Sequence, residues 1–130
     1  MDASRIAAIP ALAGLPAAEI DELAAVMTEI ETEPGVAVVT VDDFGTAVYF
    51  VEQGEADVLF EGGDRGSTLR PGDAFGEISL LLTGERTATV EARTPMRLLA
   101  LSGQDFERIR PRVPELERLL RRLGVDRAAQ

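Results

Sequence analysis

Cysteine and histidine are both absent from this 130-residue sequence. Without cysteine, the chain can form neither a disulfide bond nor a thiolate metal site. Without histidine, it lacks the side chain that most often serves as a general base and as a ligand for transition metals. We therefore expect no metal site, no cofactor, no catalytic residues and no enzymatic activity.

Long apolar runs are absent as well. No stretch approaches the roughly 18 apolar residues that a membrane-spanning helix needs. The opening residues Met1–Arg5 lack the basic stretch and apolar block of a signal peptide. Hydrophobic residues make up 45% of the chain, which is enough for a core. The length suits one compact domain. These features predict a single cytoplasmic domain over residues 1–130, with no membrane insertion.

The charge is strongly one-sided. The chain has 13 basic residues, all of them arginine, against 23 acidic residues, so its net charge is −10. Such a domain repels polyanions, and we expect no nucleic-acid binding by this chain alone. A small anion would need a locally arranged positive site, because charges are screened over about 8 Å at physiological salt.

The first part of the chain has helical periodicity. We expect a helical segment from about Ser4 to Met27, within a helical lead-in over residues 1–33. Pro16 stands where the first turn of a helix tolerates proline. Four apolar residues at i, i+3, i+4 and i+7 form the face that should pack on the rest of the domain: Ile20, Leu23, Ala24 and Met27.

Short strand-like segments dominate residues 34–101. They are rich in β-branched, aromatic and other apolar residues, and turns with Gly, Asp or Pro separate them. Many short strands with regular turns favour a barrel, roll or jelly-roll over a parallel α/β sheet. The predicted strands cover residues 36–41, 47–51, 57–60, 88–90 and 98–101.

Two helices are expected over residues 102–125. Ser102 is a candidate N-cap, with Asp105 three residues later where an acid favours the helix dipole. Phe106 and Ile109 should face inward, and Pro111 should stop this first helix. The second helix should begin near Pro114, and residues 126–130 should fray. Its apolar stripe consists of Leu116, Leu119, Leu120 and Leu123.

A stretch over residues 75–87 interrupts the strand pattern. Its composition predicts a short helix from about Gly76 to Gly84. The first N–H groups of such a helix favour an anion, and Gly76 lets a ligand approach the backbone closely. Arg86 follows the helix and could grip two phosphate oxygens, with the Thr87 hydroxyl beside it. Glu77 would be unfavourable there unless it accepted from ribose hydroxyls. The combination therefore suits a sugar phosphate.

Residues 72–90, Gly-Asp-Ala-Phe-Gly-Glu-Ile-Ser-Leu-Leu-Leu-Thr-Gly-Glu-Arg-Thr-Ala-Thr-Val, resemble the phosphate-binding cassette of the cyclic nucleotide-binding domain family. Both halves of the motif are present in order, and the resemblance extends over nearly the whole chain. It implies an α+β, mainly β fold: an eight-stranded, jelly-roll-like β-roll with N-terminal helices, a short internal phosphate-binding helix and two C-terminal helices.

The resemblance also implies roles for individual residues. Glu77 would bind the ribose 2′-hydroxyl and Arg86 the cyclic phosphate. Backbone N–H groups of Gly76, Ile78 and Ser79 would surround the phosphate, and Thr87 and Ala88 would flank it. In the family the final helix often closes over the base, which would make Leu120, Arg121 and Leu123 a lid.

Each of these roles has a structural alternative. Glu77 could simply favour a helix N-terminus, and Arg86 could be one more surface arginine. The leucine stripe of the last helix could serve packing before it serves as a lid.

The sequence thus predicts a sensor that binds a cyclic nucleotide. We expect the ligand to be cyclic AMP, and cyclic GMP is the alternative. Ligand occupancy would pass through the C-terminal helices to a fused or partner protein, or within a homodimer. The alternative is a ligand-free pseudo-sensor that serves interaction or assembly. A cupin-type enzyme is disfavoured, because the active sites of such enzymes usually hold a metal through histidines and this chain has none.

Overall fold

The computed structural model describes residues 1–39, 47–59, 65–76 and 89–128. Two four-stranded sheets hold the strands of this part of the chain, and every strand pairing is antiparallel. Sheet A has the order β1-β8-β3-β6 and sheet B the order β2-β7-β4-β5. The elements are α1 (Ala3–Ala7), α2 (Ala17–Val26), β1 (Thr28–Thr32), β2 (Ala37–Val39), β3 (Ala47–Gln53), β4 (Ala56–Leu59), β5 (Arg65–Leu69), β6 (Ala74–Phe75), β7 (Thr89–Ala92), β8 (Met96–Ser102), α3 (Gly103–Ile109), η2 (Arg110–Arg112) and α4 (Pro114–Ala128).

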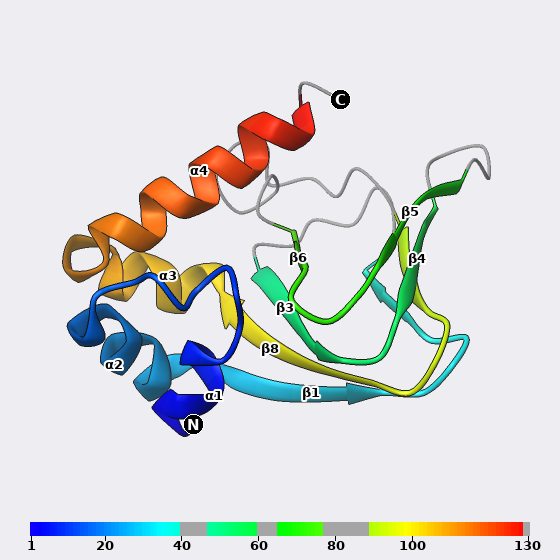
Figure 1. The fold of residues 1–130 in the computed structure, drawn as a ribbon, viewed down its shortest axis with the longest axis horizontal. Helices are drawn as coiled ribbons and strands as arrows, with labels where there is room; N and C mark the ends of the chain where they lie inside the picture. Colours follow the sequence, from blue (N-terminus) through cyan, green and yellow to red (C-terminus); the bar gives the residue numbers. More distant parts are fainter. Residues whose placement is uncertain (40–46, 60–64, 77–88, 129–130) are drawn as a thin grey trace.

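The molecule has three layers (Figure 1). Helices α1 to α4 lie on one side of sheet A, and sheet B lies on the other. This arrangement confirms the predicted class, a mainly β roll with helices at both ends of the chain.

The central strands of sheet A, β3 and β8, are buried on both faces, which explains why they read as nearly continuous apolar runs. Successive side chains of a strand point to opposite faces. Accordingly, Phe50 of β3 faces the helices while Val51 faces sheet B. On the helical side, the helical-layer cluster consists of Ile6, Ile9, Leu12, Ile20, Leu23, Met27, Val48, Phe50, Ala74, Leu99, Leu101, Phe106, Ile109, Val113, Leu116 and Leu120. Between the sheets, the inner cluster consists of Val51, Ala56, Leu69, Phe75, Val90, Ala92, Met96 and Leu98.

The predicted helical lead-in over residues 1–33 is wrong in two respects. The expected helix from Ser4 to Met27 is two helices, α1 and α2, separated by turns over residues 8–15 that contain Pro10 and Gly14. The chain then forms a strand, β1, which pairs with β8 from Thr28↔Ala100 to Thr32↔Met96. The alternation of residues 28–32 around the half-buried Ile30 is the period of a strand, not of a helix.

Five of the strands coincide with predicted ones, namely β2, β3, β4, β7 and β8. Two further strands were not predicted. Strand β5 has the hydrophilic sequence RGSTL, and β6 is only two residues long. Neither carries a periodic signal, and both exist because a neighbouring strand supplies hydrogen bonds: β4 for β5 and β3 for β6.

The C-terminal helices begin as predicted. The Ser102 Oγ accepts a hydrogen bond from the Asp105 N–H at 3.1 Å and caps α3. Phe106 and Ile109 are buried, and α3 gives way to the η2 turn that contains Pro111. Helix α4 runs to Ala128, beyond the predicted end at residue 125. No helix within residues 1–39, 47–59, 65–76 and 89–128 is long and apolar enough to cross a membrane.

Candidate functional site

Gly76 is the one predicted ligand-binding residue that the structure describes. It directly follows β6 and has a φ of +92°, in the left-handed region where a side chain is disfavoured. The other predicted ligand-binding residues lie outside the described residues, as does the predicted short helix beyond Gly76: Glu77, Ile78, Ser79, Arg86, Thr87 and Ala88.

The turn before β6 holds Gly76 in place from the N-terminal side. The backbone N–H of Asp73 donates to the Arg70 carbonyl at 2.9 Å, and the Arg70 N–H donates to Asp73 Oδ2 at 2.8 Å. Two further bonds of 2.8 Å tie the turn to β3, from the Val51 N–H to the Asp73 carbonyl and from the Gly72 N–H to the Val51 carbonyl. Strand β6 therefore starts from a closed turn attached to sheet A.

Strand β6 carries one residue for each face of sheet A. Ala74 belongs to the helical-layer cluster and Phe75 to the inner cluster. The Phe75 ring stacks on Tyr49 of β3, with centroids 5.0 Å apart and the planes inclined by 20°. Tyr49 lies in the predicted strand 47–51, and no local sequence pattern relates it to Phe75. Its register opposite Phe75 could be found only once β3 and β6 were known to pair.

The chain enters sheet B at Thr89, the first residue of β7. Thr89 is in register with Leu59 of β4, and Val90 lies between Val58 of β4 and Val39 of β2. Gly76 and Thr89 thus lie at the ends of strands in opposite sheets, and the buried residues next to them, Phe75 and Val90, both belong to the inner cluster. The described residues on either side of the motif's central part are therefore anchored in one core.

The predicted lid residues lie on α4. Leu120 is fully buried in the helical-layer cluster, and Leu123 is partly buried against the same cluster. Their contacts fit the packing alternative for the leucine stripe. Arg121 is exposed, and its Nε and Nη2 donate to Glu117 Oε2 at 3.1 and 3.0 Å.

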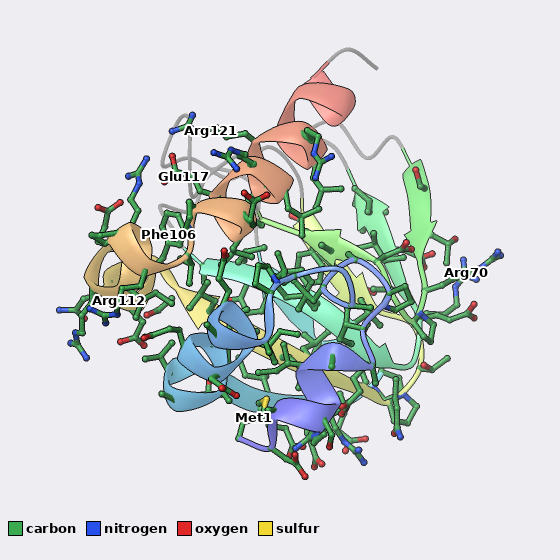
Figure 2. All side chains as sticks on the ribbon, turned by 60° about the vertical axis from the view of Figure 1, so that its left-hand side comes forward. Met1, Arg70, Phe106, Arg112, Glu117 and Arg121 are labelled. Atoms are coloured by element: carbon green, nitrogen blue, oxygen red, sulfur yellow. The ribbon has the colours of Figure 1, made fainter. Side chains whose placement is uncertain are left out.

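Glu117 of α4 pairs with two arginines at the bend between α3 and α4. It accepts from Arg110 Nε at 2.7 Å and from Arg110 Nη2 at 3.2 Å, as well as from Arg121. The Arg110 guanidinium also lies over the Phe106 ring, 5.4 Å from its centroid. Figure 2 shows Glu117 and Arg121 together on α4, near Phe106. The bonds from Arg110, and secondarily those from Arg121, lower the pKa of Glu117 to about 2.

The carboxylates of the described residues do not gather into a metal site. No group of three or more acidic side chains in this part of the chain could hold an ion. One buried carboxylate that no sequence pattern singles out is Glu19 of α2, which is only 5% exposed. It accepts hydrogen bonds from the start of α4.

The chain is similar to known proteins over most of its length. A sequence model described as the cyclic nucleotide-binding domain matches residues 29–112. A cAMP-dependent protein kinase regulatory subunit from Yarrowia lipolytica is 41% identical over 103 residues, which are 78% of this chain and 27% of that protein. The chain therefore spans about a quarter of the length of this relative.

Two solved structures share the fold. The catabolite activator protein of Thermus thermophilus is 31% identical with a TM-score of 0.80, over 92% of this chain and 58% of that one. The regulatory domain of Toxoplasma gondii protein kinase A, crystallised with cAMP, has a TM-score of 0.83 at 22% identity, over 98% of this chain and 49% of that one. Because the family's sequence model matches well over half of the chain and the β-roll is the one found in these structures, the chain belongs to the cyclic nucleotide-binding domain family.

Proposed function

We propose that this chain senses cyclic AMP: it binds the nucleotide at residues 76–88 and passes occupancy through its C-terminal helices to a fused or partner protein. The observation that carries the proposal is Gly76. It opens the two-part motif, has a φ of +92°, and stands at the end of a strand fixed from both faces of sheet A. A glycine in this conformation lets a phosphate approach the main chain.

In this proposal, each residue of the motif has one role. The Arg86 guanidinium holds the cyclic phosphate, because its planar donors suit two phosphate oxygens. The Glu77 carboxylate accepts from the ribose 2′-hydroxyl. N–H groups of Gly76, Ile78 and Ser79 surround the phosphate, and Thr87 and Ala88 flank it. These roles involve binding only, so the proposal contains no chemical step and no catalytic residue.

Cyclic AMP is proposed ahead of cyclic GMP because of the proteins that this chain resembles. The Yarrowia relative is named as cAMP-dependent, and the Toxoplasma structure contains cAMP. Thr87 is compatible with either base, so parallel titrations with the two nucleotides test the preference.

The route from ligand to output starts at β6. A displacement of Gly76 acts on Phe75 in the inner cluster and on Ala74 in the helical-layer cluster, which also contains Leu120 of α4. Because packed cores transmit strain, occupancy shifts the position of α4, where Leu120, Arg121 and Leu123 serve as the lid. A coupling of about 1–3 kcal/mol is typical for such relays. The receiver is a host protein or a second copy of the chain in the cytoplasm.

The decisive experiment is calorimetric titration of the Arg86→Ala variant with cyclic AMP. Loss of the guanidinium should weaken binding by about 3–5 kcal/mol, the usual cost of breaking a buried ion pair. This equals about a 100- to 4,000-fold rise in Kd. Glu77→Ala should cost less, about 1.5–3 kcal/mol, the range for hydrogen bonds to charged groups.

Arg70→Ala is the matched control, because the Arg70 side chain is 70% exposed and pairs only with Glu55 among the described residues. Alanine keeps the backbone hydrogen bonds that Arg70 makes in the turn before β6. It should bind like the wild type. Equal affinities in the Arg86→Ala and wild-type proteins would remove the proposed site. If the wild type binds neither nucleotide, the ligand-free interaction module replaces the sensor.

A further inference from the structure

Helix α4 begins without a cap of its own. The residue before it is Val113, a fully buried hydrocarbon side chain that cannot accept a hydrogen bond. The first N–H groups of a helix have no partner within that helix. Pro114 has no N–H, so the first donors that need an acceptor are those of Glu115 and Leu116.

A residue far back in the sequence supplies both acceptors. Glu19 of α2 accepts from the Glu115 N–H through Oε2 at 3.2 Å and from the Leu116 N–H through Oε1 at 2.9 Å. Glu19 is the one charged side chain that is buried among the described residues. A carboxylate is also the favoured charge at this end of a helix. The cap of α4 is therefore tertiary, since it comes from another helix.

Helix α2 has two further sets of interactions near Glu19. Glu22, one turn after Glu19, pairs with Arg112 Nε of the η2 turn at 3.0 Å. Figure 2 shows Arg112 at the outer edge of the helical layer, so this pair lies at the surface and adds little stability. Ile20 and Leu23 of α2 and Leu116 of α4 are members of the buried helical-layer cluster. The Glu19 bonds are therefore the direct polar link between α2 and α4 that accompanies this shared core.

We propose that Glu19 is the positioning residue of α4: its carboxylate fastens the first turn of α4 to α2, so that the two helices form one unit. Detaching α4 would break two hydrogen bonds to a carboxylate, and hydrogen bonds to charged groups are stronger than those between neutral ones. Any movement of α4 must therefore pivot at this turn or carry α2 along. The consequence for ligand binding rests on the proposed function, in which α4 is the lid.

Amide hydrogen exchange of the Glu19→Gln variant tests the attachment without any ligand. Glutamine keeps the shape of the side chain but places an NH₂ group against one of the two N–H donors. The protection factors at Glu115 and Leu116 should fall about fivefold or more, which corresponds to about 1 kcal/mol, a typical N-cap. Asp21→Asn is the control, because Asp21 is exposed on the same helix. Unchanged protection in Glu19→Gln would overturn the proposal.

A second variant separates positioning from simple capping. Val113→Thr, added to Glu19→Gln, provides a hydroxyl at the N-cap position while keeping the β-branched shape. It should restore protection of the first turn without restoring the link to α2.

The distance between α2 and α4 can be measured with spin labels. Because the chain contains no cysteine, Ala18→Cys and Arg122→Cys place one pair of labels on exposed positions of the two helices.

The label distances should be narrow in the otherwise wild-type protein and broad in Glu19→Gln, with or without Val113→Thr. A narrow distribution in the double variant would mean that Glu19 is only a cap, and would overturn the positioning role. Titration of the same proteins with cyclic AMP then tests the lid. A wild type that binds no nucleotide would refute the proposed function, whereas the exchange and distance results would still decide the role of Glu19.

Discussion

Gly54 shows how a single residue joins the two sheets. It lies between β3 of sheet A and β4 of sheet B and has a φ of +91°. A Cβ atom there would lie 2.3 Å from the Pro95 carbonyl oxygen and 2.9 Å from the Met96 Cα. The loop before β8 therefore packs directly on the glycine backbone, and both the backbone conformation and the lack of space require glycine.

Three glycine-to-alanine variants separate these two requirements. Gly54→Ala should lower the free energy of unfolding by about 3 kcal/mol or more, because it combines left-handed strain with a backbone clash. Gly35→Ala should cost only the strain, about 1–2 kcal/mol, since φ is +85° but nothing lies within 4 Å. Urea denaturation of each variant measures the difference.

Gly14→Ala is the reference for this series, because a Cβ atom there meets nothing within 4 Å and φ is not in the left-handed region. It should be neutral or stabilising by up to about 1 kcal/mol. Equal losses in Gly54→Ala and Gly35→Ala would show that the loop before β8 can move away from Gly54.

Among the elements, α3, η2 and α4 form a bend held by polar contacts on its outside. Arg110 at the start of η2 donates to Glu117 on α4 and to Glu107 on α3, the latter at 2.8 Å. The aliphatic side chains of the bend face the helical-layer cluster. Because Glu117 accepts from Arg110, the pKa of the Arg110 guanidinium is raised and that of the Glu117 carboxyl is lowered.

This pair predicts a pH dependence of stability. The folded pKa of Glu117 is about 2, below the ordinary value of 4.5, so its contribution is present above pH 4.5 and is lost as the pH falls toward 2. The side chain is 23% exposed, and solvent screening limits the contribution to about 1 kcal/mol. Chemical denaturation between pH 6 and about 2 should therefore show a smaller loss in Glu117→Gln than in the wild type.

Other carboxylates titrate in the same range, so only the difference between the two proteins is informative. Glu52, for example, also has a lowered pKa because of its hydrogen bond from Arg5. Parallel stability curves for wild type and Glu117→Gln would contradict the assignment of this acid-sensitive step to the bend.

At the scale of the whole molecule, sheet A is the layer that all other parts share. Helices cover one of its faces and sheet B covers the other, so β3, β6 and β8 each contribute residues to both apolar clusters. The motif leaves sheet A at Gly76 and returns in sheet B at Thr89. A ligand bound by both halves of the motif would therefore tie the two sheets together and stabilise the folded state as a unit.

Thermal unfolding tests this expectation directly. Cyclic AMP at 100 times its Kd should add about 2.7 kcal/mol to the stability of the folded state. For a domain of this size, Tm should rise by about 10 °C. Cyclic GMP should give a smaller rise, and Arg86→Ala should show almost none at the same nucleotide concentration. Equal rises in wild type and Arg86→Ala would mean that the nucleotide binds elsewhere.

Local sequence patterns were sufficient to predict several elements of this fold. The apolar runs of β3 and β8, the Ser102 cap and the inward Phe106 and Ile109 all depend on neighbours within a few residues. The motif at residues 72–90 likewise predicted the family without any coordinates. Helix periodicity and caps are visible in a sequence because their interactions are short in sequence.

The sequence by itself determined the mainly β class, the C-terminal helices and the family, because these follow from short-range patterns. Only the tertiary structure decided where the strands with weak sequence signals, β1, β5 and β6, pair in the sheets. It also decided which residue caps α4. Glu19 and Leu116 are 97 residues apart, and no local pattern relates a carboxylate to donors at that distance. Such contacts exist only after the core has brought α2 and α4 together.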